Sequence, residues 1–154
     1  MKNWKTLLVC LLICLLPGML GSLATAPAIP AWYAGLEKPS FNPPNWIFGP
    51  VWTTLYLMMG FSLWLAWNAK GKARKAALVA FGIQLALNAA WSPAFFGLNS
   101  PALGLAVILS LWLAIVATLF LMYRLRPLAS YLLVPYLLWV SFASVLNFAL
   151  WKMN

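Results

Sequence analysis

The sequence contains no histidine, no aspartate and only one carboxylate, that of Glu37. A Ser-His-Asp triad, a paired-carboxylate acid/base site and a carboxylate cage for Ca²⁺ each need groups that are missing here. No carboxylate or basic residue lies in the middle of a long apolar segment, which disfavours transport that depends on intramembrane acids. The available chemistry is therefore that of aromatic rings, amides, hydroxyls and thiols.

Charge is scarce as well: 7% of the 154 residues are charged and 65% are apolar. Soluble domains carry roughly 25% charged residues, so this composition predicts an integral membrane protein. Segments of about 17–25 apolar residues span a bilayer as helices. We predict an all-α fold, a single five-helix transmembrane domain over residues 1–154, with helices at 4–25, 46–68, 76–97, 102–123 and 130–151 and a lid loop at 26–45.

The first segment also fits a signal peptide, because Lys2 and Lys5 precede an apolar run and Ala24-Thr25-Ala26 resembles a cleavage site. Its apolar stretch continues to about Ala28, beyond the usual h-region of about 7–15 residues. This length favours a retained membrane helix, and cleavage remains the alternative.

Basic residues are distributed unequally between the two sides of the predicted bundle. Lys38 and Lys152 lie on one side, whereas eight lie on the other: Lys2, Lys5, Lys70, Lys72, Arg74, Lys75, Arg124 and Arg126. Cytoplasmic loops retain Lys and Arg, so we expect a cytoplasmic N-terminus. The net charge of +9 comes from short loops beside the membrane, which suits contact with anionic lipid and not with nucleic acid.

Tryptophan is abundant, with ten residues, of which six lie in three patches rich in Pro or Asn, at 32–52, 88–96 and 135–151. This pattern favours a cavity for a flat apolar ligand. Prolines stiffen the 32–46 segment, which predicts an ordered lid. An interfacial belt of aromatic anchors is the alternative.

Two helical stripes combine amides with aromatic rings and point to the same cavity. They consist of Gln84, Asn88, Trp91 and Phe95 and of Tyr136, Trp139, Ala143 and Asn147. Trp52 and Tyr56 are placed to close the cavity from the second helix. Amides in hydrocarbon need partners, so Asn88 and Asn147 are expected to face inward. Hydrogen bonding between helices without a ligand would produce the same pattern.

A ridge of small residues on the third helix predicts close helix packing: Gly82, Ala86, Ala90 and Ala94. We expect a homodimer through this ridge. Packing within one protomer is the alternative.

Four ordered motifs make the chain resemble the tryptophan-rich sensory protein and translocator protein family, also called the TspO/MBR or peripheral-type benzodiazepine receptor family. The motifs are Trp32-Tyr33-x-x-Leu36-x-Lys38-Pro39-x-Phe41-x-Pro43-Pro44, Phe48-x-Pro50-x-Trp52, Asn88-x-x-Trp91-x-Pro93-x-Phe95-Phe96 and Pro135-Tyr136-x-x-Trp139-x-x-Phe142-Ala143-x-x-Leu146-Asn147. The resemblance spans essentially the whole chain.

The resemblance implies a receptor or sensor in a membrane, here expected to be a bacterial cell membrane, that binds porphyrins, other tetrapyrroles and benzodiazepine-type drugs and takes part in tetrapyrrole or stress regulation. By position, it implies the pocket residues Tyr33, Pro43, Trp52, Tyr56, Asn88, Trp91, Tyr136, Trp139, Ala143 and Leu146. Lys38, Asn88 and indole N–H groups are candidates to receive porphyrin propionates. No cofactor or metal is expected, and the porphyrin is a ligand, held without a strong axial ligand to any iron because histidine is lacking.

Two other functions stay open under the resemblance. Light-dependent degradation of porphyrin is the first, with Trp52 and Trp139 as the oxidisable residues beside a photosensitiser. Transport of porphyrin or sterol is the second. Sterol binding is weakened because Phe148 stands where the family's sterol segment usually has a tyrosine before the basic residue.

Overall fold

A computed structural model describes residues 3–154 and confirms the all-α fold. Over these residues five spans are long and apolar enough to cross a membrane. The helices are α1 (Trp4–Ala31), the short η1 (Tyr33–Gly35), α2 (Asn45–Trp67), α3 (Arg74–Ser92), η2 (Pro93–Gly97), α4 (Pro101–Leu125), α5 (Pro127–Tyr131) and α6 (Val134–Met153).

The first helix is longer than predicted, because it continues from residue 25 to Ala31 through Pro27 and Pro30. Each proline removes one backbone donor, yet the helical pattern resumes beyond them, since the Trp32 amide donates to the Ala28 carbonyl at 2.9 Å. The lid is correspondingly shorter and occupies residues 32–44.

Proline also divides the third and fifth predicted segments. After Pro93 the third segment widens into the π-helical turn η2, where the Leu98 amide donates to the Pro93 carbonyl at 2.9 Å. The fifth segment is interrupted at residues 132–133, because Pro135 has no amide proton to continue the helix from Tyr131. These interruptions turn the side chains that follow onto new faces.

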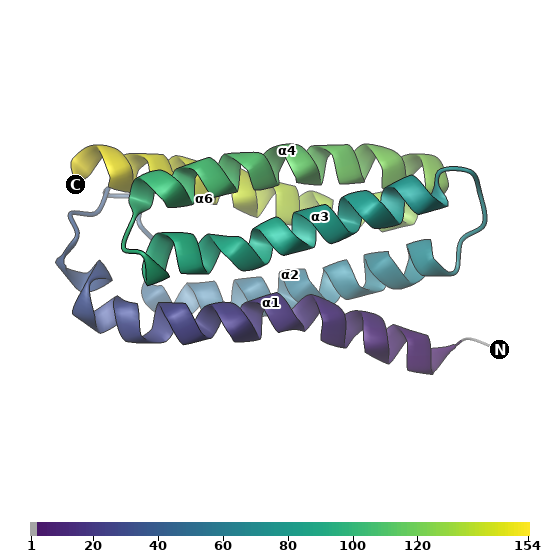
Figure 1. The fold of residues 1–154 in the computed structure, drawn as a ribbon, viewed down its shortest axis with the longest axis horizontal. Helices are drawn as coiled ribbons and strands as arrows, with labels where there is room; N and C mark the ends of the chain where they lie inside the picture. The colour runs from purple at the N-terminus through teal and green to yellow at the C-terminus, as the bar shows by residue number, and fades with distance from the viewer. Residues whose placement is uncertain (1–2) are drawn as a thin grey trace.

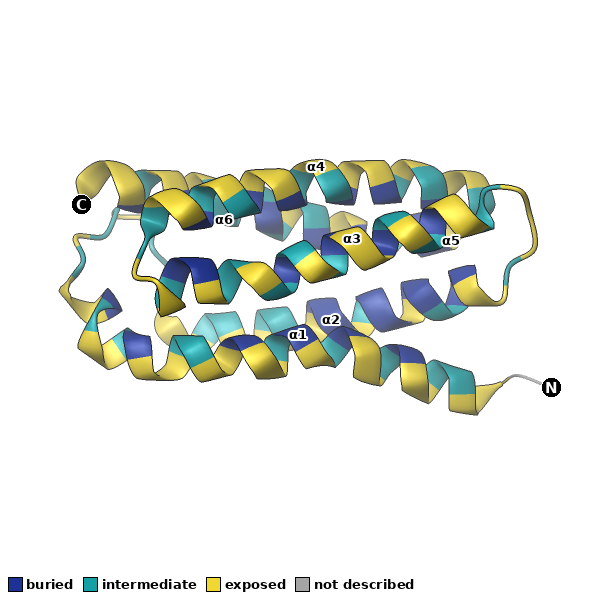
Figure 2. Ribbon diagram, viewed as in Figure 1, coloured by how far each residue is buried: buried dark blue, intermediate teal, exposed yellow. Residues whose placement is uncertain are grey.

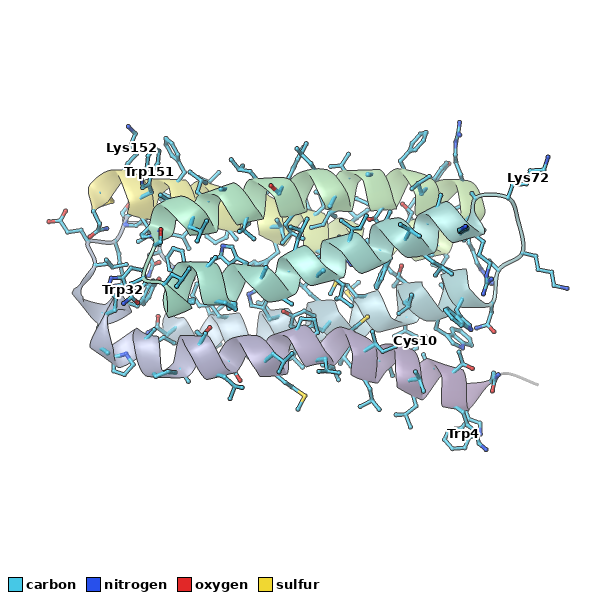
Figure 3. All side chains as sticks on the ribbon, in the orientation of Figure 1. Trp4, Cys10, Trp32, Lys72, Trp151 and Lys152 are labelled. Atoms are coloured by element: carbon cyan, nitrogen blue, oxygen red, sulfur yellow. The ribbon has the colours of Figure 1, made fainter. Side chains whose placement is uncertain are left out.

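The long helices run side by side along one axis and define two ends of the molecule (Figure 1). The charged end holds the start of α1 and the α2–α3 and α4–α5 connections, with Lys5, Lys70, Lys72, Arg74, Lys75, Arg124 and Arg126. The lid end holds the lid, the α3–α4 connection and the end of α6, with Lys38 and Lys152. Figure 3 shows Lys72 and Trp4 at one end and Trp32, Trp151 and Lys152 at the other. Lys2 lies outside the described residues.

The half of the bundle near the charged end is tightly closed. A Cβ atom on Gly60 of α2 would lie 2.9 Å from the Leu11 Cα atom of α1, so the two backbones meet without a side chain between them. The Ser62 hydroxyl donates to the Ala129 carbonyl at 2.7 Å and ties α2 to α5. Figure 2 shows the same trend, since α2 is dark blue along the half nearest this end.

Candidate functional site

The other half of the bundle contains a cavity of about 530 Å³ beneath the lid. α1, α2, α3, η2, α4 and α6 all contribute side chains to its wall, and Tyr33 closes it from the lid. Eight of the predicted site residues line it: Tyr33, Trp52, Tyr56, Asn88, Trp91, Trp139, Ala143 and Leu146. The volume is in the range of small-molecule sites, roughly 300–1,000 Å³.

Aromatic rings form paired surfaces on the walls. Trp52 stacks on Tyr56 with ring centres 5.5 Å apart, and Trp91 stacks on Phe95 at 5.2 Å. Trp139 meets Phe48 edge to face at 5.9 Å. Such surfaces suit a flat aromatic ligand, because stacking contributes about 0.5–1.5 kcal/mol beyond the burial of area.

Side chains from α2, α3 and α6 form a chain of hydrogen bonds at the floor of the cavity. The Tyr56 hydroxyl donates to Asn88 Oδ1 at 2.8 Å, and Asn88 Nδ2 donates to the Tyr136 hydroxyl at 2.8 Å. The Tyr136 hydroxyl in turn donates to Gln84 Oε1 at 2.9 Å. Both ends of the Asn88 amide are therefore engaged. Tyr136 is almost fully buried and lies behind the cavity wall instead of lining it.

A second amide, that of Asn147, links α6 to α3 and α4 at the cavity wall. Its Oδ1 accepts a hydrogen bond from Trp91 Nε1 at 3.1 Å, and its Nδ2 donates to the Pro101 carbonyl at 2.7 Å. Gly104 makes this arrangement possible, because a Cβ atom there would lie 2.7 Å from Phe95 Cδ2 and 3.0 Å from Asn147 Oδ1. The orientation of the Trp91 ring is thereby set by α4 and α6.

One indole on the cavity wall has an unused donor. Trp139 Nε1 is buried and has no hydrogen-bond partner among residues 3–154. Leaving a buried donor unpaired costs about 1–3 kcal/mol. This nitrogen is itself enclosed by neighbouring atoms, so other parts of the Trp139 ring border the cavity.

The lid is folded against itself and against α6. Tyr33 packs on Phe96 with ring centres 5.6 Å apart, and its hydroxyl donates to Asn42 Oδ1 at 3.0 Å. Burial raises the pKa of Tyr33 above its ordinary value near 10, although the Asn42 hydrogen bond opposes this shift. Lys38 Nζ lies 4.8 Å from the centre of the Tyr33 ring and donates to the Leu36 carbonyl at 3.0 Å.

The lid is also fastened to the end of α6. Asn154 Oδ1 accepts from the Glu37 amide at 2.9 Å, and Asn154 Nδ2 donates to the Glu37 carbonyl at 3.0 Å. Phe41 contacts Phe142 of α6 at 6.3 Å between ring centres. The lid is thus an ordered cover.

Three predicted site residues do not line the cavity: Lys38, Pro43 and Tyr136. Lys38 is engaged within the lid, and Tyr136 supports Asn88 from behind. Conversely, the sequence analysis missed the contribution of α1, which includes Gly18, Ser22 and Ala26, and of α4, which includes Ile108 and Leu111. Small or aliphatic residues on a membrane helix carry no signal that separates a cavity wall from ordinary packing.

The ridge on α3 is only partly available at the surface. Gly82, Ala86 and Ala90 are exposed, whereas Ala94 is buried within the protomer. Ala94 lies in η2, where the π-helical turn changes the direction of its side chain. The exposed part of the ridge therefore ends at Ala90.

No group of three or more His, Cys, Asp or Glu side chains that could hold a metal ion is present in the described part of the chain. The cavity instead offers aromatic stacking surfaces.

Comparison with known proteins identifies the family of this chain. The sequence pattern of the TspO/MBR family matches residues 10–152. The tryptophan-rich protein TspO of Chlorobaculum tepidum is 47% identical and covers 99% of this chain and 98% of its own length. The human translocator protein is 45% identical over 80% of this chain and 75% of its own. The tryptophan-rich sensory protein of Cereibacter sphaeroides is 36% identical over 99% and 93%. The chain is an integral membrane protein that belongs to the TspO/MBR family.

Proposed function

We propose that the protein is a membrane sensor that binds a tetrapyrrole such as protoporphyrin in the cavity beneath the lid. The observation that carries the proposal is the cavity itself, with Trp52, Trp91 and Trp139 on its walls. The ring faces suit a flat macrocycle. The name of the relative from Cereibacter sphaeroides, tryptophan-rich sensory protein, is consistent with a sensory role.

The donor set favours a metal-free porphyrin, or haem without a strong axial ligand. Histidine is absent from the sequence, and both the oxygen and the nitrogen of the Asn88 amide are already hydrogen-bonded within the bundle. Lys38 contacts the lid backbone and not the cavity, so it reaches a propionate only if the lid rearranges. Benzodiazepine-type drugs have the same flat apolar character and would compete for the site. A sterol offers no aromatic face and is the weaker candidate.

Titration of tryptophan fluorescence with protoporphyrin in the dark tests this function. We expect saturable quenching in the wild type and weaker binding in Trp139→Phe, which replaces the indole with a smaller ring. Trp67→Phe is the matched control, because Trp67 is exposed at the charged end and does not line the cavity. Quenching that does not saturate, or that is equal in all three proteins, contradicts the proposal.

The same titration under illumination tests the enzyme alternative. Trp52 and Trp139 both line the cavity, where they would lie beside a bound photosensitiser. Loss of the porphyrin Soret band in light, but not in Trp52→Phe or Trp139→Phe, would establish degradation. If the porphyrin Soret band stays unchanged in light, the sensor remains the proposed function. Flux of porphyrin across vesicles without either change would indicate transport.

We also propose a homodimer through the exposed part of the α3 ridge. Gly82, Ala86 and Ala89 border a shallow groove against Leu16 and Leu20 of α1, and small residues let a second helix approach closely in lipid. Ala86→Leu and Ala90→Leu should convert a dimeric wild type to monomer, as measured by mass in detergent. Ile83→Ala is the control on the same helix. An unchanged mass in Ala86→Leu contradicts this interface.

We further propose that the charged end faces the cytoplasm of a bacterial cell. Seven described cations lie at that end against two at the lid end, and cytoplasmic loops retain such residues. A thiol introduced by Lys72→Cys should react with a charged reagent only after cells are opened, whereas one introduced by Glu37→Cys should react in intact cells. The reverse result places the lid inside.

A further inference from the structure

We propose that the ligand enters the cavity sideways from the lipid, through an opening between α1 and α2, and not through the lid. This inference rests on the proposed function, because it assumes that the cavity receives an apolar molecule. It adds the route of entry, and it restricts the ligands to molecules that partition into the bilayer.

The exposed residues of the cavity wall lie on two helices only. Among the described residues that line the cavity, six are exposed, and all belong to α1 or α2: Met19, Ser22, Ala26, Asn45, Gly49 and Thr53. The lining residues from α3, η2, α4 and α6 are buried or half-buried. The cavity therefore meets the lipid along the α1–α2 seam, in the half near the lid.

The edge of this opening has no free polar group among its hydroxyls. Ser22 Oγ donates to the Met19 carbonyl at 2.6 Å, and Thr53 Oγ1 donates to the Gly49 carbonyl at 2.9 Å. Thr25 likewise donates to the Gly21 carbonyl at 2.9 Å. Each of these hydroxyls therefore has its one donor satisfied by its own helix. An apolar molecule can pass them without competing for hydrogen bonds.

α1 is the helix best suited to move. No side-chain hydrogen bond joins α1 to another helix in the described part of the chain, whereas Asn88, Asn147 and Ser62 tie the remaining helices together. Near the charged end, α1 is held against α2 by the close approach of Leu11 to Gly60. Closer to the lid, α1 meets side chains and not backbone: a Cβ atom on Gly18 would lie 2.5 Å from the Tyr56 ring, and one on Gly21 would lie 3.0 Å from Ser92 Oγ. Separation of this half of α1 therefore parts side-chain contacts while the backbone contact at Gly60 stays packed.

The lid, in contrast, has fastenings that entry from above would have to break. Tyr33 is buried against Phe95 and Phe96, and two hydrogen bonds join Asn154 to Glu37. Lateral entry requires the parting of packing contacts, such as that of Gly18 with the Tyr56 ring, but of no side-chain hydrogen bond between α1 and another helix in the described part of the chain. The seam is therefore the less obstructed of the two routes.

Bulky side chains at the seam test the route by kinetics. Gly49→Phe is suitable because a Cβ atom there meets nothing within 4 Å, so the variant should fold. Combined with Ser22→Phe, it should slow both association and dissociation of protoporphyrin supplied in vesicles by roughly tenfold, as expected for an added gate. Leu23→Phe is the matched control, since Leu23 neighbours Ser22 but does not line the cavity. Asn154→Ala, which unfastens the lid, should leave both rates unchanged.

A second measurement decides the route without a porphyrin. Ala143 lies on the α6 wall of the cavity, so Ala143→Cys places a thiol there, and the wild type with buried Cys10 and Cys14 gives the background. Uncharged N-ethylmaleimide, which enters lipid, should alkylate this thiol faster than a charged methanethiosulfonate. The seam variants should slow that alkylation.

The outcomes separate the two proposals. Slower alkylation and slower porphyrin exchange in the seam variants support lateral entry. Preferential labelling by the charged reagent, accelerated by Asn154→Ala and unaffected at the seam, overturns it. If protoporphyrin does not bind saturably, the proposed function fails, and the alkylation result still decides the route.

Discussion

The two halves of the bundle are made from the same apolar helices, yet one is closed and the other is hollow. Near the charged end, small residues let backbones meet, as Gly60 does with Leu11, and Ala66 and Ala77 are fully buried. Near the lid, large rings face one another across about 530 Å³ of space. The difference lies in what the small residues face: Gly60 faces the Leu11 backbone, whereas Gly18 and Gly104 near the cavity face the rings of Tyr56 and Phe95.

The largest effect should come from adding volume to the closed half. Gly60→Val would place its Cβ atom 2.9 Å from the Leu11 backbone, so α1 and α2 would have to separate. We expect a loss of about 3 kcal/mol or more in the free energy of unfolding. The midpoint of thermal unfolding in detergent measures it. Gly49→Val in the open half is the control, and equal losses in the two variants would contradict the contrast.

Enlarging a buried alanine should also affect the two halves differently, with a somewhat smaller loss in the free energy of unfolding than Gly60→Val. Ala77→Leu in the closed half should cost about 1–3 kcal/mol, because no space exists around the side chain. Ala143→Leu in the open half should unfold near the wild-type midpoint but bind protoporphyrin more weakly, since it fills the cavity. If Ala143→Leu were the less stable of the two, the hollow would not exist in the membrane.

The polar floor marks the boundary between the halves, and its removal should be costly. Asn88→Leu would leave the Tyr56 and Tyr136 hydroxyls without their amide partner. We expect a loss of about 1–3 kcal/mol, the penalty for buried polar groups left unpaired. Asn68→Leu, at an exposed amide that bonds only the Trp64 carbonyl, is the control for the same substitution in the unfolding assay.

The smallest effect should appear at the lid. Tyr33→Phe keeps the ring but removes the hydrogen bond to Asn42, and it should lower lid stability by about 0.5–1.5 kcal/mol. Burial raises the pKa of Tyr33 in the folded state, so the neutral Tyr33 side chain stabilises the folded lid fully below pH 10. This stabilisation is lost as the pH rises above that value. Protease cleavage of the lid should therefore accelerate above pH 10 in the wild type, and Tyr33→Phe should not show this acceleration.

Individual residues show how far sequence reasoning reached. The spacing of Asn88 with Trp91, and of Trp139 with Ala143, was enough to place all four on the cavity wall, because a helical face follows directly from its period. Tyr136 belongs to the same stripe but lies behind the wall, since it is drawn to Asn88 and Gln84. The helical period indicates which residues face the inside of the bundle, but it does not indicate how deeply each one is buried.

The sequence did not predict that α1 extends to Ala31, or that Ala94 is buried within the protomer. Proline usually predicts a helix end, but α1 passes Pro27 and Pro30, and a π-helical turn after Pro93 buries Ala94. Both outcomes depend on which backbone carbonyls find other partners. Local sequence does not contain that information.

Composition and period alone determined that this chain is a bundle of membrane helices with an aromatic interior, because hydrocarbon requires every backbone group to be paired within a helix. Only the tertiary structure decided that the bundle is hollow at one end, that Tyr136 lies behind the cavity wall, and that α1 completes that wall. Those features arise from contacts between segments far apart in the chain, where the fit of Gly60 against Leu11 or of Phe95 against Gly104 sets the distance between helices.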